Sequence, residues 1–147
     1  MAQALLPLKD LVQAKSRLAG LLRPSERRAL AQAMVEDVLA VLSGHKGIKR
    51  VTLVSDDPGA GLLATKYDID YWDESSLCCS GLNPIVQEAS TRLLAGGDEP
   101  LLVLHGDLPL LTAADISAVL HCQRQLAGLV IGCDLRSEEH TSELQSR

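Results

Sequence analysis

Apolar residues follow two alternating patterns along this chain. Short, nearly continuous apolar runs are typical of strands buried in a parallel sheet, and apolar positions at helical spacing are typical of amphipathic helices. The runs predict strands at residues 2–8, 49–55, 69–72, 101–104 and 128–133. The helical spacing predicts helices at residues 24–42, 61–67, 82–94 and 113–126. This alternation predicts βαβ units, and therefore an α/β fold with a mainly parallel, doubly wound sheet flanked by helices.

The same patterns predict which helix faces pack against the sheet. The apolar face of the helix at 24–42 is predicted to comprise Leu30, Met34, Val38, Leu39 and Leu42. The face of the helix at 82–94 is predicted to comprise Ile85, Val86, Ala89, Leu93 and Leu94. Between elements, the sequence Asp56-Asp57-Pro58-Gly59 is a strong turn signal. Residues 73–81 have no periodicity, so we expect a loop there.

The segment LLVLHGDLPLLT, residues 101–112, contains the first candidate for chemistry. Its apolar run predicts a central strand buried on both faces, ended by His105-Gly106, with Asp107 just beyond the carboxyl end. Open α/β sheets bind their ligands at that end of the strands. A carboxylate beside a glycine suits a hard cation such as Mg²⁺ carrying nucleotide phosphates. From spacing alone, Asp107 could equally cap the helix after Thr112 or close a turn.

Composition narrows the classes of partner. Hydrophobic residues make up 46% of the 147 residues, which indicates a globular domain. The net charge is −5, aromatic residues make up 2% and phenylalanine is absent, so a nucleic-acid surface is not expected. The cations are densest at Lys9, Lys15, Arg17 and Arg23. That cluster could hold a phosphorylated small molecule or form a solvated helix face.

Nothing in the sequence predicts export or membrane insertion. The first residues lack a basic region followed by a long apolar stretch, and no apolar run approaches the ~20 residues of a membrane span. Cys78, Cys79, Cys122 and Cys133 match no zinc or redox spacing. We therefore expect a cytoplasmic protein with free thiols and no membrane partner.

Residues 136–147, RSEEHTSELQSR, differ in kind from the preceding chain. They have no core-facing period, and they match the translation of a sequencing adapter. A genuine disordered tail is the alternative. We expect the domain to comprise residues 1–135, with an adapter-encoded, non-native tail at 136–147 and a sheet that is incomplete at its C-terminal end.

Several segments in a fixed order resemble a known family. They are LPLKDLVQAKSRL at 6–18, ERRALAQAMVEDVL at 26–39, LVSDDP at 53–58, GLNPIVQEA at 81–89 and LVLHGDLPLLT at 102–112. The chain resembles the guanylyltransferases of deazaflavin coenzyme biosynthesis, within the MobA-like nucleotidyltransferases. This resemblance implies a Rossmann-like fold of the nucleotide-diphospho-sugar transferase type. Residues 1–135 would be its N-terminal, nucleotide-binding part.

The resemblance also implies a reaction and roles for residues. Members of the family transfer GMP from GTP to 2-phospho-L-lactate, phosphoenolpyruvate or 3-phosphoglycerate and release pyrophosphate. Lys15 and Arg17 would hold the triphosphate, joined by Lys9, because cationic side chains offset the growing charge on pyrophosphate. Asp107 would bind Mg²⁺ bridging the phosphates.

The guanine base would be read elsewhere. Asn83 would contact the guanine edge, because an amide offers both a donor and an acceptor, and Ser55 and Asp56 would line the same pocket. Each has a simpler interpretation. Asn83 could be a helix N-cap, and the residues at 56–59 could be mainly a turn.

This chain departs from the family pattern, so alternatives remain open. The family normally continues with a glycine-threonine-asparagine segment and a later carboxylate that help to bind the acceptor acid and a second metal, and neither is present in this sequence. Another MobA-like nucleotidyltransferase, using CTP, a sugar phosphate or a molybdopterin cofactor, is a second interpretation, although the LxAGGxSxRxGxxK loop of those enzymes is absent. A non-catalytic nucleotide-binding domain is a third. An open sheet edge would also leave homodimer formation open.

Overall fold

The computed structural model describes residues 2–8, 19–77, 81–97, 99–106, 108 and 110–126. The chain divides into two compact units, Met1–Ala113 and Ala114–Arg147. The first unit contains β1 (Ala2–Leu8), α1 (Pro24–Gly44), β2 (Ile48–Ser55), α2 (Ala60–Tyr67), β3 (Asp70–Asp73), η2 (Glu74–Leu77), α3 (Leu82–Leu94) and β4 (Leu101–Val103). Helix α4 (Ala113–Leu126) begins at the boundary and makes up the described part of the second.

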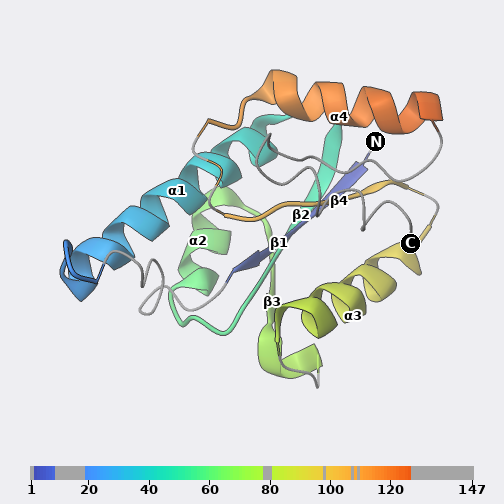
Figure 1. Ribbon diagram of the computed structural model, residues 1–147. Coiled ribbons are helices and arrows are strands. Elements are labelled where there is room, and N and C mark those ends of the chain that lie inside the picture. The colour runs from blue at the N-terminus through green and yellow to red at the C-terminus, as the bar shows by residue number, and fades with distance from the viewer. Residues whose placement is uncertain are drawn as a thin grey trace, which may run out of the picture. The chain divides into compact units, whose positions relative to one another are not determined.

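The four described strands form one parallel sheet in the order β3-β2-β1-β4. In its register, Leu8 at the end of β1 lies opposite Ser55 at the end of β2, and Ser55 lies opposite Asp73 at the end of β3. The carboxyl ends of these strands therefore meet at one edge of the sheet. This arrangement, with strands and helices in alternation, confirms the α/β prediction (Figure 1).

Helices cover both faces of the sheet in the first unit (Figure 1). Helices α1 and α2 contact each other and lie against β2, whereas α3 lies against β1 and β4. The core on the α3 side comprises Leu5, Val54, Leu77, Ile85, Ala89 and Leu93, with Trp72, Val86 and Leu101 packed against it. Each fully buried leucine or valine stabilises the folded state by about 1.5–3 kcal/mol relative to an exposed one. This packing therefore holds the carboxyl ends of the strands in place.

Helix α1 begins at a well-formed N-terminal cap. Pro24 occupies the first turn, where its missing N–H costs nothing. The backbone N–H of Arg23 donates to Oε1 of Glu26 at 2.9 Å, and this bond lowers the pKa of the Glu26 carboxyl. The cap therefore fixes the residue at which the chain enters α1.

The predicted buried face of α1 is wrong in its first half. Its buried residues are Ala31, Val35, Val38, Leu39 and Leu42, whereas Leu30 is 38% exposed and Met34 is half-buried. At 3.6 residues per turn, residues spaced four apart rotate around the helix axis by about 40° at each step. Residues spaced alternately four, three and four apart stay on one face of the helix. The stripe through Ala31 and Val35 therefore continues to Val38 and Leu42, and the stripe through Leu30 does not.

The structure also differs from the prediction at β4. Within the described part of the chain, β4 pairs only with β1, and Val103 is 39% exposed, so the prediction that this strand is buried on both faces is wrong. A continuous apolar run does not distinguish a central strand from one paired on a single side. The strand predicted at 128–133 lies outside the described residues.

The segment expected to be a loop at 73–81 is partly regular. Asp73 ends β3, and residues 74–77 form the short 3₁₀ helix η2. Oδ1 of Asp73 accepts the backbone N–H and the hydroxyl of Ser75 at 3.0 and 2.9 Å, which lowers the pKa of the Asp73 carboxyl. Local side-chain bonds of this kind shape the chain without any apolar period.

Among the described helices, none has the length and apolar character needed to cross a membrane. Cys122 is a free, exposed thiol, while Cys78, Cys79 and Cys133 lie outside the described residues.

Candidate functional site

The candidate site lies at the carboxyl edge of the sheet, where α/β folds bind ligands. The predicted residues Lys9, Lys15, Arg17 and Asp107 lie outside the described residues. Ser55, Asp56 and Asn83 are described. The geometry of the site is therefore built from these three, from their partners, and from the residues that precede Lys9 and Asp107 in the chain.

Leu8 and Gly106, the residues that precede Lys9 and Asp107, are close together in space. A Cβ atom placed on Gly106 would lie 3.7 Å from Cδ1 of Leu8 and 2.7 Å from Cγ2 of Val35 on α1. Leu8 is the last residue of β1 and precedes Lys9, and Gly106 precedes Asp107. The segments that lead into the predicted cationic loop and the predicted metal ligand thus meet at one point of the sheet edge.

Ser55 is part of the framework of this edge. Its side chain is fully buried, and its Oγ accepts the backbone N–H of Asp57 at 3.0 Å. Its carbonyl oxygen accepts the hydroxyl of Tyr71, from the neighbouring strand, at 3.2 Å. Asp56, the next residue, is exposed. Of the two residues predicted to line the base pocket, Asp56 faces solvent and Ser55 holds the turn.

Tyr71 keeps its proton under ordinary conditions. Burial raises the pKa of its hydroxyl, and the nearby carboxylates of Asp73, Asp56 and Asp57 raise it further. The hydroxyl therefore remains a donor to Ser55.

Within the described part of the chain, no group of three or more His, Cys, Asp or Glu side chains could hold a metal ion.

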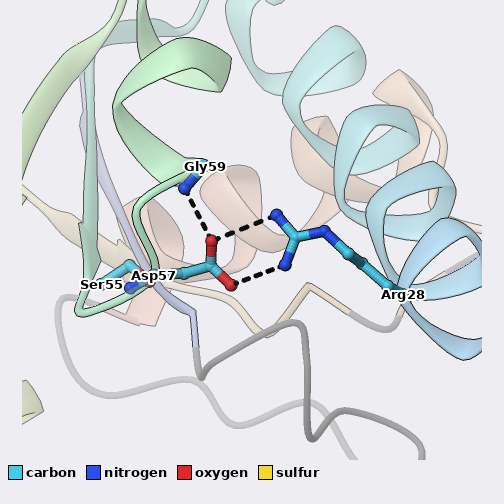
Figure 2. A network of polar contacts seen from close by, with 4 residues as sticks. All are labelled: Arg28, Ser55, Asp57 and Gly59. Carbon is cyan, nitrogen blue, oxygen red and sulfur yellow. Dashed lines mark hydrogen bonds and ion pairs between the residues drawn. The ribbon is translucent and has the colours of Figure 1, made fainter. Parts of the chain in front are cut away.

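Asp57 is the residue of this edge that the sequence did not single out. It is buried, and its Oδ1 accepts the backbone N–H of Gly59 at 2.7 Å (Figure 2). Nη1 and Nη2 of Arg28 lie 3.4 Å from Oδ2 and 3.5 Å from Oδ1 of the same carboxylate (Figure 2). The aspartate was within a predicted turn, and no local pattern indicates a partner 29 residues earlier.

Asn83 lies in the first turn of α3. The N-cap of this helix is Gly81, whose φ of 90° favours glycine. The interpretation of Asn83 as the N-cap is therefore wrong. Its side chain is exposed and makes no hydrogen bond among the described residues, so its amide is available to a ligand.

Comparison with known proteins identifies a family for this chain. A family model described as "Guanylyl transferase CofC like" matches residues 2–135. The matched region contains every predicted site residue.

Two curated relatives are more than a third identical to the chain over the aligned residues. The phosphoenolpyruvate guanylyltransferase of Conexibacter woesei is 38% identical over 141 residues, which cover 96% of this chain and 62% of that protein. The phosphoenolpyruvate guanylyltransferase of Chloroflexus aggregans is 34% identical over 133 residues, covering 88% of this chain and 64% of that protein. The chain thus spans less than two thirds of the length of these relatives.

Solved structures confirm the predicted fold type. A Desulfovibrio desulfuricans G20 protein described as a nucleotide-diphospho-sugar transferase has a TM-score of 0.68 at 14% identity, over 84% of this chain and 55% of that one. CMP:2-keto-3-deoxy-manno-octonic acid synthetase, complexed with CTP, has a TM-score of 0.57 at 18% identity, over 87% of this chain and 49% of that one. At these identities the likeness concerns the fold alone.

Proposed function

The chain belongs to the CofC-like guanylyl transferase family, and we propose that it forms the nucleotide-binding part of an enzyme that transfers GMP from GTP to a phosphorylated three-carbon acid. Phosphoenolpyruvate is the acid that this proposal favours, because relatives at 33–38% identity are named for it. 2-Phospho-L-lactate and 3-phosphoglycerate are the other acids of this proposal, and deazaflavin coenzyme biosynthesis is its pathway.

The observation that carries the proposal is the extent of the family match. It runs from residue 2 to residue 135 and includes the ends of β1, β2, β3 and β4, which form the candidate edge. In the reaction, an oxygen of the acid's phosphate attacks the α-phosphorus of GTP, the bond to the α–β bridging oxygen breaks, and pyrophosphate leaves. Such a reaction needs positioning and charge neutralisation more than a covalent nucleophile.

The proposed roles divide between the triphosphate and the metal. Lys15 and Arg17, with Lys9, would hold the triphosphate and offset the charge that develops on pyrophosphate. Asp107 would hold Mg²⁺, which neutralises phosphate charge when it is bound. The contact of Gly106 with the end of β1 supports a site that combines the cationic residues with the metal ligand. Leu8 and Gly106 directly precede Lys9 and Asp107 in the chain.

The proposed base pocket comprises Asn83, in the first turn of α3, and Asp56, which follows β2. Asn83 would read guanine with an exposed amide that has no partner among the described residues. Asp56 would contribute an exposed carboxylate, which can accept the N1–H and N2–H donors of guanine. Ser55 would act by holding the turn that carries Asp56.

A direct test is a transfer assay with α-labelled GTP and Mg²⁺. The full-length protein that contains this chain is incubated with phosphoenolpyruvate, 2-phospho-L-lactate, 3-phosphoglycerate or no acid, and α-labelled ATP serves as the matched nucleotide control. We expect label in a guanylylated acid, together with an equal amount of pyrophosphate, only when GTP and an acid are both present. No product with any of the acids, or equal product from ATP, would contradict the proposal.

A further inference from the structure

We propose that Arg28 is a further phosphate-binding residue of this site, and that it contacts the triphosphate of the nucleotide. In this proposal Asp57 is a positioning residue that orients the guanidinium, and Gly59 leaves room for it. The inference rests on the proposed guanylyl transfer and adds residues that the sequence did not single out.

Arg28 lies at the edge where the nucleotide is expected. Helix α1 connects the parallel strands β1 and β2, so its N-terminal turns lie toward the carboxyl ends of the strands. Arg28, Ala31 and Val35 have the i, i+3, i+7 spacing of one helix face, and Val35 lies against Gly106. Arg28 is about 10 Å nearer the start of the helix than Val35. Its guanidinium reaches Asp57, in the turn that follows β2.

The arginine keeps donors for a ligand. Asp57 takes one hydrogen bond from each Nη atom, which leaves Nε–H and the outer Nη hydrogens without a partner among the residues that the structure describes. The side chain of Arg28 is 34% exposed, whereas that of Asp57 is fully buried, so the pair opens to solvent on the arginine side. A planar set of donors that remains accessible fits a phosphate well.

The carboxylate of Asp57 holds the guanidinium in one orientation. Its Oδ1 is fixed by the Gly59 N–H at 2.7 Å, and the whole side chain is enclosed, so it cannot follow a movement of the arginine (Figure 2). A polar link between α1 and α2 does not require this pair, because Glu36 on α1 already binds Lys66 and Tyr67 on α2. A buried carboxylate is a costly way to tie the turn before α2 to α1, which favours a role beyond packing.

Gly59 provides a second observation on the same pair. A Cβ atom at this position would lie 2.8 Å from Nη2 of Arg28 and 3.1 Å from Oδ1 of Asp57. The backbone of Gly59 has a φ of −78°, which every residue type can adopt. The absence of a side chain at position 59 therefore serves the placement of the guanidinium and not the conformation of the turn.

The test compares GTP with guanosine by equilibrium dialysis of labelled ligands in the presence of Mg²⁺. The variants are Arg28→Gln, Asp57→Asn and Gly59→Ala. Gly61→Ala is the matched control, because a Cβ there would meet only the Tyr71 ring at 3.9 Å.

The loss of a hydrogen bond to a charged group corresponds to about a 10- to 100-fold change in Kd. We expect Arg28→Gln to weaken GTP binding by that factor, and Asp57→Asn and Gly59→Ala to weaken it about 3- to 10-fold.

Guanosine separates a phosphate contact from a general loss of structure. We expect its Kd to stay unchanged in Arg28→Gln, and both ligands to bind Gly61→Ala as they bind the wild type. Unchanged GTP binding in Arg28→Gln, or an equal loss for GTP and guanosine, would overturn the inference and leave the proposed function standing. A wild-type chain that binds no GTP would overturn both.

Discussion

Gly106 lies so close to Val35 that a methyl group at position 106 would be 2.7 Å from Cγ2 of the valine. This contact joins the segment after β4 to the middle of α1. The packing of α1 therefore constrains the backbone at Gly106.

Gly106→Ala is expected to destabilise the protein by about 1–3 kcal/mol, because an extra methyl group must displace Val35 or the segment itself. Urea unfolding measures the change. In a double-mutant cycle with Val35→Ala, the smaller side chain should relieve part of the cost, so the two changes should be less than additive. Full additivity, or no destabilisation by Gly106→Ala, would show that the contact is not the constraint described.

Glu36 should give the stability a measurable dependence on acid pH. Hydrogen bonding to Lys66 lowers the pKa of the Glu36 carboxyl below its ordinary value of 4.5. Its contribution is therefore fully present above about pH 4.5 and is lost as the pH falls through the lower folded-state pKa. Because Lys66 is 62% exposed, solvent screening keeps the effect small.

The measurement is the free energy of unfolding of Glu36→Gln and the wild type from about pH 6 to pH 2.5. The two curves should converge as the pH falls, because the variant lacks the carboxylate whose protonation weakens the wild type. Glu88→Gln, which removes an exposed partner of Arg92, is a matched control. Parallel curves for Glu36→Gln and the wild type would contradict this account.

Asn83→Ala is expected to reduce the preference for GTP over ATP about tenfold, because it removes an amide that can pair with the guanine edge. Stability should change by less than about 0.5 kcal/mol, since the side chain is exposed and is not the helix cap. Gln87→Ala, an exposed amide one turn further along α3, is the control. Equal loss of selectivity in both variants would argue against base reading by Asn83.

Asp107→Asn should remove most of the Mg²⁺ dependence of GTP binding. The amide is nearly isosteric but uncharged, and Mg²⁺ favours carboxylate ligands. We expect at least about a tenfold loss of affinity with Mg²⁺ and little change without it. Asp37→Asn, on an exposed position of α1, is the charge-matched control. A variant whose Mg²⁺ titration matches that of the wild type would place the metal ligand elsewhere.

The sequence predicted the order of elements well because each depends on local pattern. The strand Ala2–Leu8 and the helix Ala113–Leu126 have the predicted bounds. The errors arise where the outcome depends on packing. Leu30 and Ala31 are both apolar and differ by one position on α1, and only the approach of the sheet decides which is buried.

The same distinction applies to the candidate site. Asp56 and Asn83 are single residues beside element ends, which a sequence can indicate, and both are exposed in the structure. The pairing of Arg28 with Asp57 spans 29 residues and depends on how α1 crosses the sheet. The close approach of the Arg28 guanidinium to Gly59 depends in turn on that pairing. Such long-range contacts leave no periodic trace in the sequence.

The most direct measurement is a calorimetric titration of the chain with GTP, ATP and CTP, each in the presence of Mg²⁺. The central claim is that the carboxyl edge of the sheet forms a guanine-selective nucleotide site. It predicts saturable binding of GTP and at least about a tenfold weaker response to ATP and CTP. A chain that unfolds cooperatively but binds the three nucleotides equally, or binds none of them, would contradict that claim.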